Sequence, residues 1–150
     1  MGSLGDLFPP EWRAERASQQ VQPGAVLRTL VTDTTPPKIK RWIVVAATSD
    51  TLLLGLVYIN SEINPNIFPE RDRHLHVRMD PDERGLVEKT CYADCSALHS
   101  MPLEKAQALL TVDAGCLLGH LAGHELGHLQ QTVAGSRRMS VVEKRRFGLI

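Results

Sequence analysis

The chain has 150 residues, and 43% of them are hydrophobic, which is enough for one compact domain with a sizeable core. Seventeen basic and 17 acidic residues leave no formal net charge, so the overall charge indicates no polyanionic or polycationic partner. No segment has the composition of a secretory signal or the length of an apolar membrane span. We therefore expect a cytoplasmic protein with no membrane partner.

The chain contains three cysteines, an odd number for a disulfide framework. Without a secretory signal, such cysteines are ordinarily reduced thiols. We expect them to be small core residues, at Cys91, Cys95 and Cys116.

Residues 1–22 combine prolines with closely spaced charges and predict a loosely packed leader. Pro23-Gly24 then marks a turn, and a single domain is expected over residues 23–150. The first half of this domain is rich in β-branched apolar runs and alternating patterns, which favour strands. The expected strands cover residues 25–31, 39–48, 51–59, 74–79 and 90–95, with a long exposed loop over residues 60–70.

From Pro102 onward the spacing of apolar residues changes to that of helices. Pro102 predicts the start of one helix, because proline is favoured in the first turn, and residues 122–134 predict a second helix. Strands first and helices last predict a mostly β fold, a small and strongly bent sheet or barrel with C-terminal helices. The expected buried faces are Leu103, Ala106, Leu109 and Leu110 on the first helix and Leu126, Leu129 and Val133 on the second.

The second helix carries the sequence HELGH, which matches the HExxH motif of zinc peptidases. On a helix His124 and His128 share one face and can bind one zinc ion, with Glu125 as the general base. A zinc peptidase needs a third protein ligand. The 22 residues after His128 contain no histidine or aspartate, and their one glutamate, Glu143, stands among basic residues as an expected ion-pair partner. His120 continues the spacing upstream, but three ligands at i, i+4 and i+8 span about 12 Å, too far for one zinc ion. We therefore expect surface histidines that lie off the apolar stripe of this helix.

Several segments, taken in order, resemble one known family. They are PGAV at 23–26, KRWIVV at 40–45, LVYI followed by Asn60-Ser61, GLVEKTCYADCS at 85–96 and GHLAGHELGHLQQTV at 119–133. In this order and spacing the chain is similar to the PemK/MazF-like growth inhibitors, the toxins of type II toxin–antitoxin modules. The resemblance covers about residues 23–135. It implies an SH3-like β-barrel, usually a homodimer with an antitoxin protein as partner. It also implies an endoribonuclease that needs no metal or other cofactor and cleaves single-stranded RNA by attack of a ribose 2′-hydroxyl.

The resemblance also implies roles for individual residues. Arg41 matches the catalytic basic position of the family, where a planar guanidinium suits phosphate oxygens. Asn60 and Ser61 match the end of the strand that carries a catalytic hydroxyl. Asn60 departs from that pattern, so Ser61 would supply the hydroxyl. The further RNA contacts that we expect are Lys38 and Lys40 in the same groove as Arg41, Trp42 stacked on a base, and Arg71 and Arg73 along the backbone, in a basic run that continues to His74 and His76. The alternatives are a core position for Trp42 and a charged strand edge for the basic run.

Two other functions stay open. The departure at Asn60 and the neutral charge also fit a catalytically degenerate SH3-like barrel that only binds protein or RNA. The other alternative is a zinc metallopeptidase with His124 and His128 as ligands and Glu125 as base.

Overall fold

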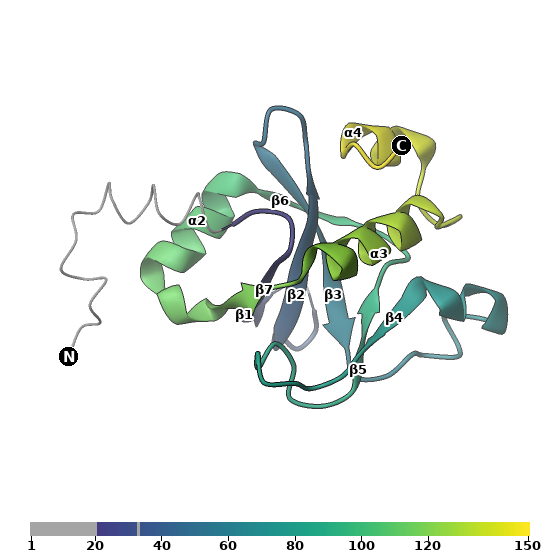
Figure 1. The fold of residues 1–150 in the computed structure, drawn as a ribbon, viewed down its shortest axis with the longest axis horizontal. Helices are drawn as coiled ribbons and strands as arrows, with labels where there is room; N and C mark the ends of the chain where they lie inside the picture. The colour runs from purple at the N-terminus through teal and green to yellow at the C-terminus, as the bar shows by residue number, and fades with distance from the viewer. Residues whose placement is uncertain (1–20, 33) are drawn as a thin grey trace.

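The computed structural model of the chain describes residues 21–32 and 34–150, so the predicted leader lies almost wholly outside the described residues. Its framework is a curled antiparallel sheet, a half-barrel, with helices packed against it (Figure 1). The mostly β fold that the sequence predicts is therefore confirmed. The strands are β1 (Ala25–Val31), β2 (Lys38–Ala47), β3 (Leu53–Asn60), β4 (His76–Met79), β5 (Cys91–Asp94), β6 (His99–Pro102) and β7 (Leu117–His120).

The strands follow the order β4-β5-β3-β2-β1-β7 across the sheet. Along one edge, β3 pairs with two strands: its first half pairs with β6, and Ile59 and Asn60 pair with β5. In the described part of the chain the outermost strands, β4 and β7, do not pair with each other, so the half-barrel is open. The helices are α2 (Leu103–Val112), α3 (Gly123–Ala134) and α4 (Val141–Arg146), with short 3-10 helices η2 (Glu70–Leu75) and η3 (Ala114–Cys116).

β2 is buried on both faces, which explains its continuous apolar run. Trp42 and Val44 pack in one core cluster with buried residues of α2, whereas Ile43 and Val45 pack in a second cluster with buried residues of α3. Successive side chains of a strand point to opposite faces, so a strand covered on both faces is apolar at every position. Figure 1 shows α2 on one side of the central strands and α3 on the other.

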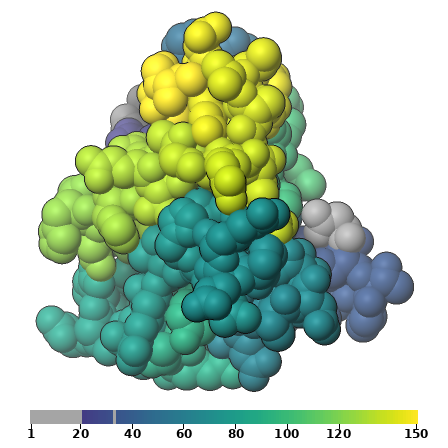
Figure 2. All heavy atoms as spheres, turned by 90° about the vertical axis from the view of Figure 1, so that its right-hand side faces the viewer, coloured from purple at the N-terminus to yellow at the C-terminus, as the bar shows by residue number. Residues whose placement is uncertain are grey.

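The C-terminal segment packs on the same side of the sheet as α3. Figure 2 shows α4, in yellow, next to α3, with the teal residues that precede β5 below them. Phe147 follows α4, is 3% exposed and belongs to the α3 cluster. Gly55 of β3 makes this contact possible, since a Cβ at residue 55 would lie 3.1 Å from the Phe147 ring and 3.0 Å from Leu98.

Most of the predicted elements are confirmed to within a few residues. The predicted strand over residues 25–31 is β1, and the two apolar runs that follow form the β2–β3 hairpin. The predicted helices are α2 and α3, and α3 ends at Ala134 as the Gly135 turn indicates. Of their predicted buried faces, the residues that are fully buried are Ala106, Leu110, Leu129 and Val133. All three cysteines are buried and form no disulfide.

Two predictions are wrong at their ends. The first two residues of the predicted strand over residues 74–79 belong to η2 instead, because the chain turns after Pro69 and the Asp72 amide bonds back to its carbonyl. The segment 119–133, which the resemblance matches to one helix, starts with the end of a strand, because residues 117–120 form β7 and pair with the outer edge of β1. His120 therefore does not share a helix with the histidines of the HELGH motif. None of the helices in the described ranges combines the length and apolar character needed to cross a bilayer.

Candidate functional site

A cleft of about 610 Å³ opens where β2 begins and β3 ends. Its walls come from these two strands, from the loop after β3 and from the segment that leads into β5. This volume lies in the range typical of small-molecule and cofactor sites. Five of the residues predicted to form the site line it, although 23 positions separate the first from the last: Lys38, Lys40, Arg41, Asn60 and Ser61.

Lys40 and Asn60 are in direct contact in this cleft. The Lys40 Nζ donates a hydrogen bond to the Asn60 Oδ1 at 3.1 Å, and the ammonium lies 5.0 Å from the centre of the Tyr58 ring. Tyr58 and Asn60 are two residues apart on β3 and therefore share one face of the sheet. Lys40 is thus a cation held on the Asn60 face, where it can bind a phosphate oxygen.

Arg41 reaches the cleft from the other face of β2, because successive residues of a strand alternate. Its Nη2 lies 3.3 Å from the Oε1 of Glu88, whose side chain is 80% exposed. Its Nε is buried and has no hydrogen-bond partner among the described residues. The guanidinium therefore has a free donor, but it is separated by the strand from Lys40 and Asn60. Lys38, Lys40 and Arg41 thus line the same cleft, with Arg41 on the opposite face of β2 from Lys40.

The remaining predicted RNA contacts lie elsewhere. Trp42 is 1% exposed, and its Nε1 donates to the Thr29 hydroxyl at 2.8 Å, so it is a core residue and the prediction of base stacking is wrong. Arg73 lines a neighbouring hollow of about 510 Å³ that also includes Ser61. Arg71 is 73% exposed beside Asp72 and lies outside the cleft lining.

His76 of β4 and Asp94 of β5 face each other across the sheet. From the sequence, His76 is expected only in the basic run of Arg71 and Arg73, as an RNA-backbone contact or a charged strand edge, and Asp94 has no expected role. Both line the cleft, and the His76 Nε2 lies 3.9 Å from the Asp94 Oδ1. His76 belongs to an alternating run that reads as an exposed strand edge. Its burial comes from Phe68 of the preceding loop, whose ring centre lies 4.2 Å away.

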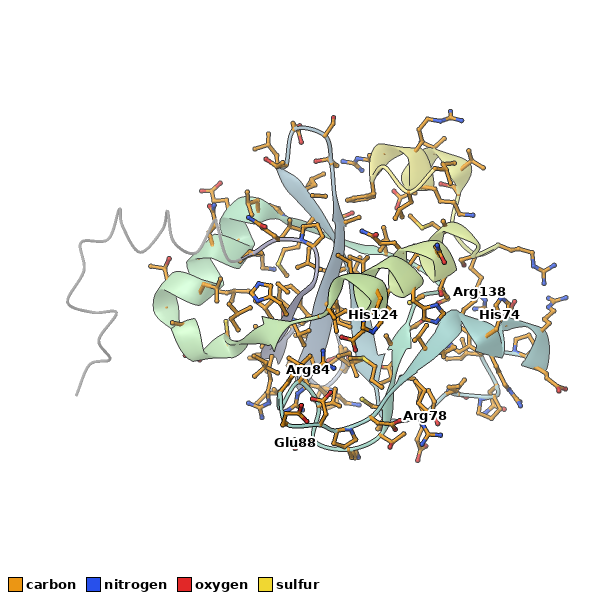
Figure 3. All side chains as sticks on the ribbon, viewed as in Figure 1. His74, Arg78, Arg84, Glu88, His124 and Arg138 are labelled. Carbon is orange, nitrogen blue, oxygen red and sulfur yellow. The ribbon has the colours of Figure 1, made fainter. Side chains whose placement is uncertain are left out.

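The HELGH segment is arranged as a helix start rather than as a zinc site. Glu125 receives hydrogen bonds from both terminal nitrogens of Arg84, and its Oε1 also accepts from the Ala122 amide at 2.9 Å. Hydrogen bonding by Arg84 holds the pKa of Glu125 below its ordinary value. His124 and His128 are exposed, and among residues 21–32 and 34–150 no three His, Cys, Asp or Glu side chains are grouped to hold a metal ion. The side chains present do not fit a three-ligand zinc centre, and Figure 3 shows Arg84 below His124.

A second cavity of about 400 Å³ lies beside this helix start. Its floor is apolar and includes Met79 and Leu86, while its rim carries Arg84 and the two histidines of the motif. The charged groups on this rim are already paired, since Arg84 also binds Asp82. The cleft at the ends of β2 and β3 is therefore the better candidate site.

Comparisons of the chain with models of protein families, with curated proteins and with solved structures gave no match. The arrangement of its own side chains is therefore what bears on the function of this chain.

Proposed function

We propose that the chain is a PemK/MazF-like endoribonuclease, and that its half-barrel is a variant of the SH3-like barrel of that family. The observation that carries the proposal is the cleft, whose lining includes Arg41, Asn60 and Ser61 although they lie on different strands or beyond a strand end. The substrate is single-stranded RNA, and the proposal includes a homodimer and an antitoxin protein as partner.

The chemistry needs no metal in this proposal. The ribose 2′-oxygen attacks the neighbouring phosphorus, and the charge that develops on the phosphorane oxygens needs cationic or N–H donors. Arg41 offers an unpaired Nε–H and Lys40 an ammonium at the same cleft. An RNA backbone that crosses the ends of β2 and β3 would contact both faces of β2. Ser61, directly after β3, would help to orient the phosphate.

A second function is favoured by a specific observation, the neutralisation of Arg41. Glu88 forms an ion pair with Arg41, and Asn60 already accepts the hydrogen bond of Lys40. Glu62 and Asp94 add further negative charge to the cleft. A barrel in this state would bind RNA or protein without cleaving RNA.

The test is to incubate the purified chain with single-stranded RNA oligonucleotides in the presence of EDTA. We expect products that end in 2′,3′-cyclic phosphate and 5′-hydroxyl groups, and no cleavage of the matching DNA. Arg41→Ala should reduce the rate by about 100-fold or more, as loss of a transition-state donor does. Arg145→Ala, an exposed position on α4, is the matched control and should cleave as the unchanged chain does.

The outcomes separate the two functions. RNA that is bound but left intact would support the binding module and refute the nuclease. Cleavage that is unaffected by Arg41→Ala would refute the role of Arg41 while leaving the nuclease in place. An RNA that is neither bound nor cleaved would refute both RNA-directed functions.

A further inference from the structure

His76 belongs to a row of polar residues on one face of the sheet. Asn60 pairs with Tyr92 across β3 and β5, and Asp94 pairs with His76 across β5 and β4. Paired residues, and residues two apart on a strand, share a face. Asn60, Tyr92, Asp94 and His76 therefore lie on the same face, and Lys40 joins them through its hydrogen bond to Asn60.

These residues are also close together. Diagonal neighbours on adjacent antiparallel strands lie about 7–8 Å apart, and Asn60 and Asp94 are such a pair. His76 is the direct partner of Asp94. Lys40 at one end of this row and His76 at the other both line the cleft.

The His76 ring has hydrogen-bonding capacity that the protein does not use. Its side chain is 1% exposed, and neither Nδ1 nor Nε2 has a hydrogen-bond partner within the described residues. Asp94 lies at 3.9 Å, beyond hydrogen-bond distance. Buried polar groups in folded proteins are nearly always satisfied, and an unpartnered ring in the wall of the cleft can therefore pair with a ligand atom. A neutral imidazole offers one donor and one acceptor, and a ligand hydroxyl group can donate to the acceptor nitrogen.

The surroundings of His76 favour a neutral ring that can accept a proton. Burial is the main cause that lowers the pKa of His76 below its ordinary value; the Asp94 carboxylate on β5 opposes this shift, and Arg138 adds to it. Phe68 packs edge-on against the ring and holds its plane. Arg138 in turn lies 4.5 Å from the Phe68 ring and is bound to Asp72, so the loop that covers His76 is fixed to the segment after α3. Asp94 is itself held by hydrogen bonds from the amide and hydroxyl of Ser96.

We propose that His76 is the general base of the cleft and takes the proton from the ribose 2′-hydroxyl of bound RNA. This inference rests on the proposed ribonuclease function and names a catalytic residue that the resemblance does not include. The 2′-oxygen then forms a bond to phosphorus as the bond from phosphorus to the 5′-oxygen breaks. The 5′-oxygen takes a proton from water. Asp94 stabilises the imidazolium that forms, and Lys40 offsets the charge on the phosphorane.

The test compares His76→Gln with His74→Gln across a range of pH, with the same RNA oligonucleotide. Glutamine keeps a polar side chain of similar length but cannot take the proton. His74 is an exposed residue of η2 two positions away (Figure 3), so it is a matched control. We expect His76→Gln to lower kcat/KM by about 100-fold or more and to abolish the acidic limb of the pH profile. His74→Gln should retain both, and binding of the matching DNA oligonucleotide should be equal in all three proteins.

Three other outcomes are possible, and each contradicts either the ribonuclease function or the role of His76. If the unchanged chain leaves RNA intact, the proposed function fails and this inference fails with it. If His76→Gln cleaves at the normal rate with the acidic limb present, the base is another group and the nuclease stands. If His76→Gln loses DNA binding to the same extent as activity, His76 is a binding residue and the inference is wrong.

A measurement on the unchanged chain covers the case in which the variant does not fold. The pKa of the His76 imidazole can be followed by NMR, and the rate of a single turnover can be followed over the same pH range. The base must be deprotonated to act, so the rate should rise with pH through the pKa of His76. Agreement of the two values supports the inference, and a rate that is flat across the pKa of His76 overturns it.

Discussion

Replacing Glu125 by glutamine separates the structural role of the HELGH segment from a catalytic one. Glu125 lies at the third position of α3, where its charge favours the helix N-terminus, and it forms a two-pronged ion pair with Arg84. The first effect contributes about 0.5 kcal/mol. The ion pair contributes about 0.5–1 kcal/mol, the upper part of the range for surface pairs, because the geometry is bidentate but the Glu125 side chain is 30% exposed. Glu125→Gln should therefore reduce the free energy of unfolding by about 1–1.5 kcal/mol at neutral pH.

The loss should depend on pH in one direction. The folded protein lowers the pKa of Glu125, so the stabilisation is fully present above the pKa of the unfolded chain. It disappears as the pH falls through the lower, folded pKa. Urea unfolding at neutral and acidic pH should show the unchanged chain and Glu125→Gln differing at neutral pH and converging in acid.

Glu143 provides a matched control, since it occupies the third position of α4. No ion pair of Glu143 is found among the described residues, so Glu143→Gln should lose only the helix-end effect. Arg84→Gln and the double variant complete a cycle that isolates the pair. Equal stability of Glu125→Gln and the unchanged chain at neutral pH would refute this account. A rise in melting temperature on adding zinc, lost in His124→Ala and His128→Ala, would restore the metal site instead.

Three further predictions concern residues in the core. Trp42→Phe should lower stability by about 1–2 kcal/mol, since it removes the hydrogen bond to Thr29 and some buried area; RNA affinity measured by fluorescence anisotropy should not change, and a clear loss would return Trp42 to the site. Gly55→Ala should lower stability by about 1–3 kcal/mol through overpacking against Phe147; urea unfolding should show a smaller loss when Phe147→Leu is present, and an equal loss would argue against that contact. Burial raises the pKa of Cys95 to about 12, so iodoacetamide at pH 8 should leave it unmodified until urea unfolds the chain, as mass spectrometry can establish.

The parts of the fold that the sequence predicts well are those where local pattern and tertiary packing agree. The apolar run Trp42–Ala46 predicts a strand, and the structure explains it through helices on both faces. Gly119 shows the opposite case. It precedes His120 in a segment with helical spacing, yet its φ of 154° is one that glycine adopts readily, and it pairs with Val26 at the edge of β1. Pairing with a strand nearly 100 residues away is decided by the tertiary structure, which local periodicity does not contain.

The candidate site is predictable only in part for a similar reason. Lys38, Lys40 and Asn60 lie near strand ends that the apolar runs define, so their meeting follows from the β2–β3 hairpin. The meeting of His76 and Asp94 depends on the register of β4 and β5 and on Phe68 folding over the ring. Neither of these two features leaves a local pattern in the sequence. From the sequence alone, an alternating run with two histidines indicates an exposed strand edge, because the packing of Phe68 on His76 is not visible there.

Strand alternation also changes what the resemblance to the toxin family means for this chain. The resemblance puts Arg41 and Asn60 in one catalytic group, whereas β2 and β3 direct them to opposite faces of the sheet. Asn60 has Lys40 beside it at 3.1 Å, and Arg41 has Glu88 at 3.3 Å. A single phosphate on the Asn60 face would therefore be neutralised by Lys40, and Arg41 would reach that phosphate only where the RNA backbone crosses the end of β2. Comparing Lys40→Ala with Arg41→Ala in the cleavage assay decides between the faces. A larger loss of kcat in the lysine variant would locate the reaction beside His76, and a larger loss in the arginine variant would locate it beside Glu88.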